Sequence, residues 1–150
     1  MQAIRQILVP TDFSETSKQA VDDALDLAQK FDASVTLIHV EQLPIFPYAE
    51  PMFVYGTQIE KEIRDRAQAE MDKLAKDCEA RLGRSVGKKI AIGSPPNEIV
   101  EEAKIGKYDL IVIATHGRTG ITHLLIGSTA ERVVQLAPCR VLTVRGATKA

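Results

Sequence analysis

Two short segments of this 150-residue chain combine polar side chains with glycines in a way that suits a phosphate group. The first is Pro10-Thr11-Asp12-Phe13-Ser14. The second is Ala114-Thr115-His116-Gly117-Arg118-Thr119-Gly120, followed by Gly127-Ser128-Thr129. Glycines let a backbone approach a ligand closely, and a helix that begins near Ser128 would present free N–H groups and the positive end of its dipole. The spacing therefore predicts an anion site, most naturally for phosphate, with Arg118 as an added positive charge.

Each of these residues also has a purely structural interpretation. Gly117 and Gly120 would serve equally well to shape a turn, and Arg118 to carry a solvated charge. Ser128 opens the sequence Ser-Thr-Ala-Glu, which is typical of a capping box at the start of a helix. Asp12 is compatible with four roles: a base, a magnesium ligand, an acceptor for a ribose hydroxyl, or the cap of the first helix.

The cysteines and histidines give little support to disulfide or metal chemistry. Cys78 and Cys139 are too few for a disulfide framework, and their spacing matches no metal or redox motif. Two reduced thiols are typical of a cytoplasmic protein. His39, His116 and His123 do not form a dense cluster of zinc ligands, and His116 is expected instead to orient the loop or a phosphate group.

The composition disfavours several classes of partner. Lys plus Arg is 19 and Asp plus Glu is 20, a net charge of −1, whereas nucleic-acid and anionic-membrane binders need a large positive field. No apolar run approaches the roughly 20 residues that a membrane span requires, and residues 1–5 lead into a strand-like segment rather than a signal peptide. We therefore expect a cytoplasmic protein that forms one domain over residues 1–150 and binds neither nucleic acid nor membrane.

Hydrophobic periodicity predicts strands that alternate with helices. Short apolar runs typical of buried strands lie at residues 4–10, 34–40, 86–92, 110–114 and 140–144. Helical spacing is found at residues 20–31, 58–82, 94–105 and 128–137, and the apolar stripe of the second helix begins at Ile59. This alternation, with right-handed crossovers, implies an α/β fold: a doubly wound parallel sheet with helices on both faces.

The segment from Leu43 to Tyr55 differs from the rest of the chain. It holds three prolines, which exclude a regular helix or a central strand, and four aromatic residues follow or separate them. The segment is longer than most connections in compact domains. It is therefore interpreted as a lid or a surface for a protein partner, or more simply as a loop that covers one end of the sheet.

Ligands of doubly wound sheets lie beyond the carboxyl ends of the strands, where the strand order reverses. Neither standard nucleotide signature is present in this chain. It has no G-x-x-x-x-G-K-[ST], and no G-x-G-x-x-G follows its first strand. A P-loop NTPase and a dinucleotide-dependent dehydrogenase are therefore disfavoured.

The motifs nevertheless resemble those of the universal stress protein family, in its small, single-domain form that binds adenine nucleotides. The resemblance covers nearly the whole chain and rests on ILVPTDFS at residues 7–14, LIHV at 37–40, GSP at 93–95 and, above all, THGRTG at 115–120 with LLIGS at 124–128. The family's nucleotide pattern is G-x2-G-x9-G-[ST]. Gly117, Gly127 and Ser128 match it, whereas its first glycine is Ala114 here. The methyl group of Ala114 would either crowd the base or ribose or lie harmlessly at the strand end.

This resemblance implies a five-stranded sheet in the order 3-2-1-4-5, of the adenine nucleotide alpha hydrolase-like type. It also implies a site for ATP, or for AMP or ADP, together with Mg2+. Pro10, Thr11 and Asp12 would border the adenosine, and Val40 would meet the adenine edge through its backbone. The remaining residues would line and hold the ribose and phosphates: Ala114, Thr115, His116, Gly117, Arg118, Gly127, Ser128 and Thr129.

The resemblance further implies a homodimer, because the family pairs its last strands across a two-fold axis. In this chain that strand is Arg140–Val144. Its β-branched residues would otherwise leave an exposed edge, which independently favours pairing.

Functions from different classes stay open on this evidence. The favoured one is a stress-response regulatory protein that binds an adenine nucleotide and reports through its dimer or its aromatic loop. An enzyme, at most a slow Mg-dependent ATPase or a phosphotransferase, is less favoured, since no phosphate-directed lysine and no nucleophile–base pair lie beside the loop. A dimeric scaffold without nucleotide is a further alternative. A response-regulator receiver is disfavoured, because residues 90–93 (IAIG) stand where its acceptor aspartate would be needed.

Overall fold

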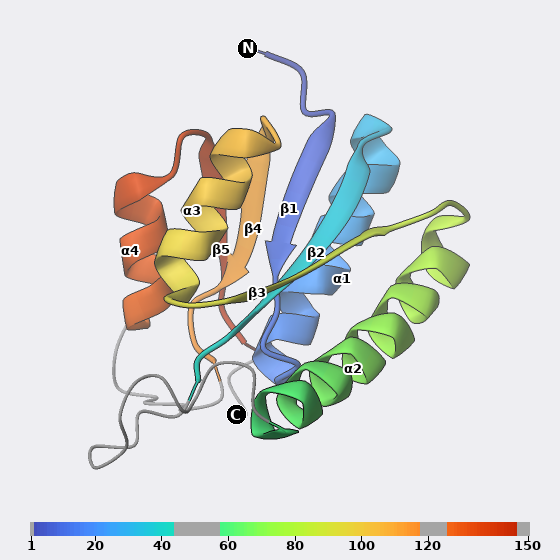
Figure 1. Ribbon diagram of the computed structural model, residues 1–150. Helices are drawn as coiled ribbons and strands as arrows, with labels where there is room; N and C mark the ends of the chain where they lie inside the picture. Colours follow the sequence, from blue (N-terminus) through green and yellow to red (C-terminus); the bar gives the residue numbers. More distant parts are fainter. Residues whose placement is uncertain (1, 44–57, 118–125, 147–150) are drawn as a thin grey trace.

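The computed structural model describes residues 2–43, 58–117 and 126–146, in which strands and helices alternate strictly (Figure 1). In chain order the elements are β1 (Gln6–Pro10), α1 (Glu15–Phe31), β2 (Ser34–Glu41), α2 (Gln58–Leu82), β3 (Gly87–Ile92), α3 (Pro95–Ile105), β4 (Leu110–Ala114), α4 (Ser128–Leu136) and β5 (Arg140–Val144). All strand pairs are parallel, in the order β3-β2-β1-β4-β5. The predicted α/β class is confirmed, and the strand order is the one that the resemblance implied.

Both faces of the sheet are covered, because its central strands are apolar at successive positions. Ile7 and Val9 of β1 point into one core cluster, which they share with α1 and α2. Leu8 points the other way, into a second cluster with α3 and α4. Figure 1 shows the same division, with α1 and α2 on one side of the sheet and α3 and α4 on the other. Successive side chains of a strand leave on opposite faces, so a continuous apolar run is what such a two-sided core requires.

Most element bounds agree with the periodicity, and the differences have local causes. β1 begins at Gln6 rather than at residue 4, because its pairing with β2 starts there, opposite Ser34. β3 begins at Gly87 rather than at residue 86. The backbone N–H of Val86 donates instead to the carboxylate of Glu79, at 3.0 Å, which ties that residue to the end of α2.

The bounds of α2 match the predicted helix, but its apolar stripe is buried over only part of its length. The buried residues are Ala67, Met71, Ala75 and Cys78, all in the later turns. Ile59, where the predicted stripe begins, is 53% exposed, so the first turn of α2 does not pack into the described core. No helix in the described part of the chain is both long and apolar enough to cross a membrane.

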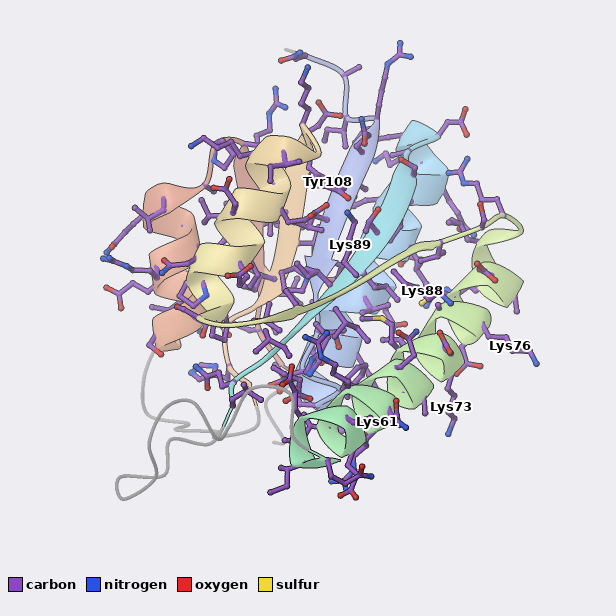
Figure 2. All side chains as sticks on the ribbon, in the orientation of Figure 1. Lys61, Lys73, Lys76, Lys88, Lys89 and Tyr108 are labelled. Carbon is purple, nitrogen blue, oxygen red and sulfur yellow. The ribbon has the colours of Figure 1, made fainter. Side chains whose placement is uncertain are left out.

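The outer strand β3 carries two consecutive lysines whose side chains diverge to opposite faces of the sheet (Figure 2). Lys88 pairs with Asp72 of α2 at 2.8 Å, and Lys89 pairs with Glu102 of α3 at 3.2 Å. Glu102 also accepts a hydrogen bond from the Tyr108 hydroxyl at 3.3 Å. Lysines on an edge strand discourage pairing with another chain, so this edge of the sheet is protected.

Cys78 provides a measurable consequence of core burial. The residue is buried in the core cluster that α2 shares with α1 and the sheet, and desolvation, helped by the negative charge of Asp77, raises the pKa of its thiol to about 11. An unfolded cysteine has a pKa of roughly 8.5. Between these values the unfolded thiol loses its proton while the native thiol keeps it, so ionisation of the unfolded state lowers the stability of the native state as the pH rises.

We therefore predict that raising the pH destabilises the wild-type protein more than a variant without this thiol. The free energy of unfolding, measured by urea denaturation, should fall more steeply for the wild type than for Cys78→Ala between about pH 8 and about pH 10.5. The comparison removes the contribution of all other titrating groups. Identical slopes for the two proteins would contradict the burial of a protonated thiol.

Candidate functional site

The carboxyl ends of β1, β2 and β4 surround a cavity of about 420 Å3. β1 and β4 pair only at Ile7 with Leu110 and at Leu8 with Ile111. Beyond these pairs the two strands take different partners, since the N–H of Thr11 donates to β2 and the N–H of Thr115 donates to β5, each at 2.9 Å. The cavity therefore lies where the strand order reverses, which is the position at which doubly wound sheets bind ligands.

The structure brings together the two segments that the sequence singled out. Every predicted site residue within the described chain lines the cavity: Pro10, Thr11, Asp12, Val40, Ala114, Thr115, His116, Gly117, Gly127, Ser128 and Thr129. Arg118 lies outside the described residues. The predicted lid or partner segment, after its first residue Leu43, also lies outside them.

A network of hydrogen bonds fixes the turn between β1 and α1. The Thr11 hydroxyl accepts from the N–H of Phe13 at 3.1 Å and lies 3.1 Å from the hydroxyl of Ser17. The carboxylate of Asp12 accepts from the N–H of Ser14 at 3.0 Å. Phe13 has a φ of 63°, a left-handed conformation that costs a residue with a side chain roughly 1–2 kcal/mol. The surrounding contacts must offset that cost, so the turn is specified by its environment rather than by local preference.

This turn also corrects one interpretation of Asp12. The N-cap of α1 is Ser14, whose hydroxyl accepts from the N–H of Ser17 at 3.2 Å. Asp12 lies two residues earlier and does not cap the helix. Its carboxylate lines the cavity while one oxygen stabilises the turn.

Gly127 is required by a close approach to backbone, and Gly117 lies against a side chain that would have to shift to admit a Cβ atom. A Cβ atom on Gly117 would collide with the carboxylate of Asp12. A Cβ atom on Gly127 would lie 2.7 Å from the carbonyl oxygen of Thr115, the same oxygen that accepts the Gly127 N–H. These contacts explain the spacing of the motif in physical terms: one glycine brings the loop after β4 against the turn after β1, and the other returns the chain to the end of β4.

The helix N-termini at this edge differ in how well they would receive an anion. Ser14 already caps α1, and α3 begins with two prolines, Pro95 and Pro96, which have no N–H to offer. α4 begins after Gly127, which has no side chain to cap it. The helix geometry leaves its first N–H groups without intrahelical acceptors, and Thr129 and Ala130 in this turn line the cavity.

The start of α4 also shows that the predicted capping box is wrong. The N-cap is Gly127, and Ser128 is already the first helical residue. The reason is the bond from the Gly127 N–H to Thr115, which holds residue 127 in an extended conformation and starts the helix one residue earlier than the Ser-Thr-Ala-Glu pattern suggested. Ser128 is exposed at the cavity rim rather than engaged in a cap.

Sequence reasoning missed several residues that line the cavity. The most notable are His39 and Glu41, near the end of β2. His39 is buried, with Nδ1 at 2.7 Å from the carbonyl oxygen of Thr11 and Nε2 at 2.9 Å from Oε1 of Glu41. Their spacing of two residues on a strand, which puts both side chains on one face, was the signal in the sequence.

The residues that the structure describes contain no group of side chains that could hold a metal ion by themselves. Nowhere in residues 2–43, 58–117 and 126–146 do three or more His, Cys, Asp or Glu side chains gather as a metal site. Within the cavity, the Thr115 hydroxyl lies 3.0 Å from Nδ1 of His116, which fixes that ring beside the loop. The polar groups at this end of the cavity include hydroxyls, an imidazole and backbone N–H groups, which suit an oxyanion, and also the Asp12 carboxylate, which lies against Gly117.

A doubly wound sheet with a glycine-lined cavity at its switch point defines an α/β domain of the class that binds ligands beyond the carboxyl ends of its strands. The chain belongs to the universal stress protein family, whose family model matches residues 3–145. It is 37% identical over 143 residues to Universal stress protein MJ0531 of Methanocaldococcus jannaschii, covering 94% of this chain and 82% of that protein.

Solved structures of the same family share this fold. The universal stress protein UspA from Lactobacillus plantarum superposes with a TM-score of 0.83 at 27% identity, covering 97% of this chain and 100% of that one. A universal stress protein in complex with cAMP has a TM-score of 0.69 at 25% identity, covering 97% of this chain and 100% of that one. A structural neighbour of this chain thus binds an adenine nucleotide.

Proposed function

We propose that this protein binds an adenine nucleotide, ATP or the related AMP or ADP, in the cavity between β1 and β4. The observation that carries the proposal is the convergence of the two motif segments on one cavity, beside the uncapped start of α4. The neighbour that was solved with cAMP supports the adenine nucleotide as ligand. The cavity volume of about 420 Å3 is within the range of sites for small molecules and cofactors.

In this proposal the phosphates lie at the start of α4. The N–H groups of its first turn and the hydroxyls of Ser128 and Thr129 would donate to the phosphate oxygens, and the helix dipole would stabilise their charge. His116 and Gly117 line the same region. Mg2+ would enter with the nucleotide, held mainly by the phosphates; the hydroxyl oxygens of the cavity wall suit such a hard cation, which keeps several waters.

The adenosine would occupy the part of the cavity between β1 and β2. Pro10 and Thr11 form its wall, the Asp12 carboxylate suits a ribose hydroxyl, and the backbone of Val40 suits the edge of the base. Ala114 is half-buried and also lines the cavity. Its methyl group occupies space that a glycine would leave open, so this residue is expected to tune affinity.

We further propose that the protein acts as a homodimer in a stress-response role in the cytoplasm. Two free cysteines are typical of a reducing compartment. β5 is an outer strand without the lysines that protect β3, and its Leu142 is 39% exposed. Val134 and Leu136, on the adjacent helix α4, are exposed as well. Pairing β5 with a second copy would satisfy that edge and cover apolar surface.

The first prediction of this proposal is that freshly purified protein carries, or readily takes up, an adenine nucleotide. Mass spectrometry of the small molecules released on denaturation should identify AMP, ADP or ATP. Titration of nucleotide-free protein with Mg-ATP should give a saturable heat signal. No binding at millimolar ATP would contradict the proposal and leave a dimeric scaffold as the alternative.

The second prediction compares substitutions at the two ends of the glycine motif, Gly127 and Ala114, for their effect on Mg-ATP binding. Gly127→Val should weaken Mg-ATP binding by roughly tenfold to a hundredfold, because the new side chain collides with the Thr115 carbonyl and displaces the first turn of α4 from the phosphates. Ala114→Gly is the matched control at the other end of the loop, and should preserve or strengthen binding. Circular dichroism should show that both variants fold. Normal binding by Gly127→Val would mean that the site lies elsewhere.

The third prediction concerns the dimer. Leu142→Lys should shift the protein from dimer to monomer in sedimentation-velocity experiments, since a charge would then lie in the paired edge. Ile105→Lys is the matched control, because Ile105 is a still more exposed apolar residue on α3. A wild-type monomer, or equal behaviour of the two variants, would contradict pairing through β5.

A further inference from the structure

His39 occupies a buried position between the two segments that shape the adenosine end of the cavity. Its side chain is 6% exposed, and each ring nitrogen meets an oxygen: Nδ1 the carbonyl of Thr11, and Nε2 the carboxylate of Glu41. The ring also packs against Phe13 in a tilted arrangement, with 4.5 Å between centroids and 34° between the planes. One side chain of β2 thus contacts the first and third residues of the turn that carries Asp12.

The chemistry of these contacts requires a proton between His39 and Glu41. A carbonyl oxygen only accepts, so Nδ1 must carry a hydrogen and donate it to Thr11. In a neutral ring Nε2 would then hold only a lone pair, facing the lone pairs of a carboxylate oxygen at 2.9 Å. That distance is favourable only when a proton lies between the two atoms, carried by the imidazole or by the carboxyl group.

The turn depends on these contacts because its own conformation is unfavourable. Phe13 is held at a φ of 63°, and its ring finds support on the His39 ring. Thr11 is fixed from both sides of the backbone, by its N–H bond to Ile38 of β2 and by its carbonyl bond to His39. Asp12 lies between Thr11 and Phe13, so its direction into the cavity follows from how these two neighbours are held.

We infer that His39 and Glu41 form a proton-dependent clamp that positions the Asp12 turn for nucleotide binding. The inference rests on the proposed function for its effect on affinity, while the clamp itself is a property of the turn. Both residues are positioning residues in this account. When the shared proton is lost, the carboxylate repels Nε2, the His39 ring shifts, and the turn loses its support. Affinity for the nucleotide therefore falls as the pH rises.

Other titratable groups are present around this pair, and the test must separate them from it. Asp12 and His116 line the cavity together with this pair, and the elements packed against β2 carry further charged groups, among them Glu15 and Lys18 on α1, Glu60 and Arg64 on α2, Lys88 and Lys89 on β3, and Glu98 on α3. The phosphates of the nucleotide titrate as well. All of these groups are unchanged in a variant at Glu41, so a difference between the two pH profiles reports the His39–Glu41 pair. Glu41 also lines the cavity, and the hydrogen-exchange measurement without nucleotide separates the clamp from direct repulsion between its carboxylate and the phosphates.

Glu41→Gln is the decisive variant. Its side-chain amide can donate to a neutral Nε2 or accept from a protonated one, so the contact persists at every pH. With Mg-ATP as the probe, calorimetric titrations between roughly pH 5 and pH 9 should show wild-type affinity falling up to about tenfold more than that of Glu41→Gln. Tyr108→Phe, which removes a hydroxyl bond to Glu102 away from the cavity, should follow the wild-type profile. Parallel profiles for wild type and Glu41→Gln would overturn the clamp.

A second measurement needs no nucleotide. The N–H groups of Phe13 and Ser14 donate within the turn, so their hydrogen exchange reports its order. His39→Phe keeps an aromatic ring but removes both polar contacts, and should accelerate exchange at these two amides by about tenfold while leaving Leu8 and Val9 of β1 protected. The same amides should exchange faster with rising pH in the wild type than in Glu41→Gln.

The two measurements distinguish failure of the clamp from failure of the proposed function. If His39→Phe and Glu41→Gln both change the amide exchange of Phe13 and Ser14 but the protein binds no nucleotide, the clamp is supported and the proposed ligand is rejected. If the protein binds nucleotide but neither variant changes the amide exchange or the pH profile of binding, the ligand is supported and the clamp is rejected.

Discussion

The brief pairing of β1 with β4 is the constraint on which the rest of this structure depends. The chain starts at the centre of the sheet, winds outward to β3, and returns on the other side of β1. The two central strands share only two register pairs before each follows its outer neighbour. Where the two strands diverge, a cavity opens that is lined by strand ends and by the first residues of α3 and α4. The rest of the sheet keeps a packed apolar core on each face.

The walls of this cavity are held by contacts that cross the gap between the strands. Gly117 lets the loop after β4 come against Asp12, and Gly127 returns the chain to the carbonyl of Thr115. On the opposite side, His39 supports the turn after β1. Each contact joins segments distant in sequence, so the site is assembled only when the sheet has formed.

The chain has a net charge of −1, so any attraction for an anion must come from groups at the cavity itself rather than from an overall positive charge. Of the three helices α1, α3 and α4, α1 is capped by the Ser14 side chain, α3 begins with two prolines that have no N–H to donate, and α4 begins at the cavity without a side-chain cap. Such a helix start suits a single anion and does not need the broad positive field that a polyanion would require.

The order and type of the elements could be predicted from the residues alone, because apolar periodicity records which faces of a strand or helix are buried. The runs at Ile7-Leu8-Val9 and at residues 110–114 sufficed to predict strands covered on both faces, and the glycine spacing identified Gly117 and Gly127, which line the cavity. The start of α4, the role of Asp12 in its turn and the pairing of His39 with Glu41 became known only from the folded chain. These features arise from contacts between strand ends, whose distances and directions no local pattern encodes.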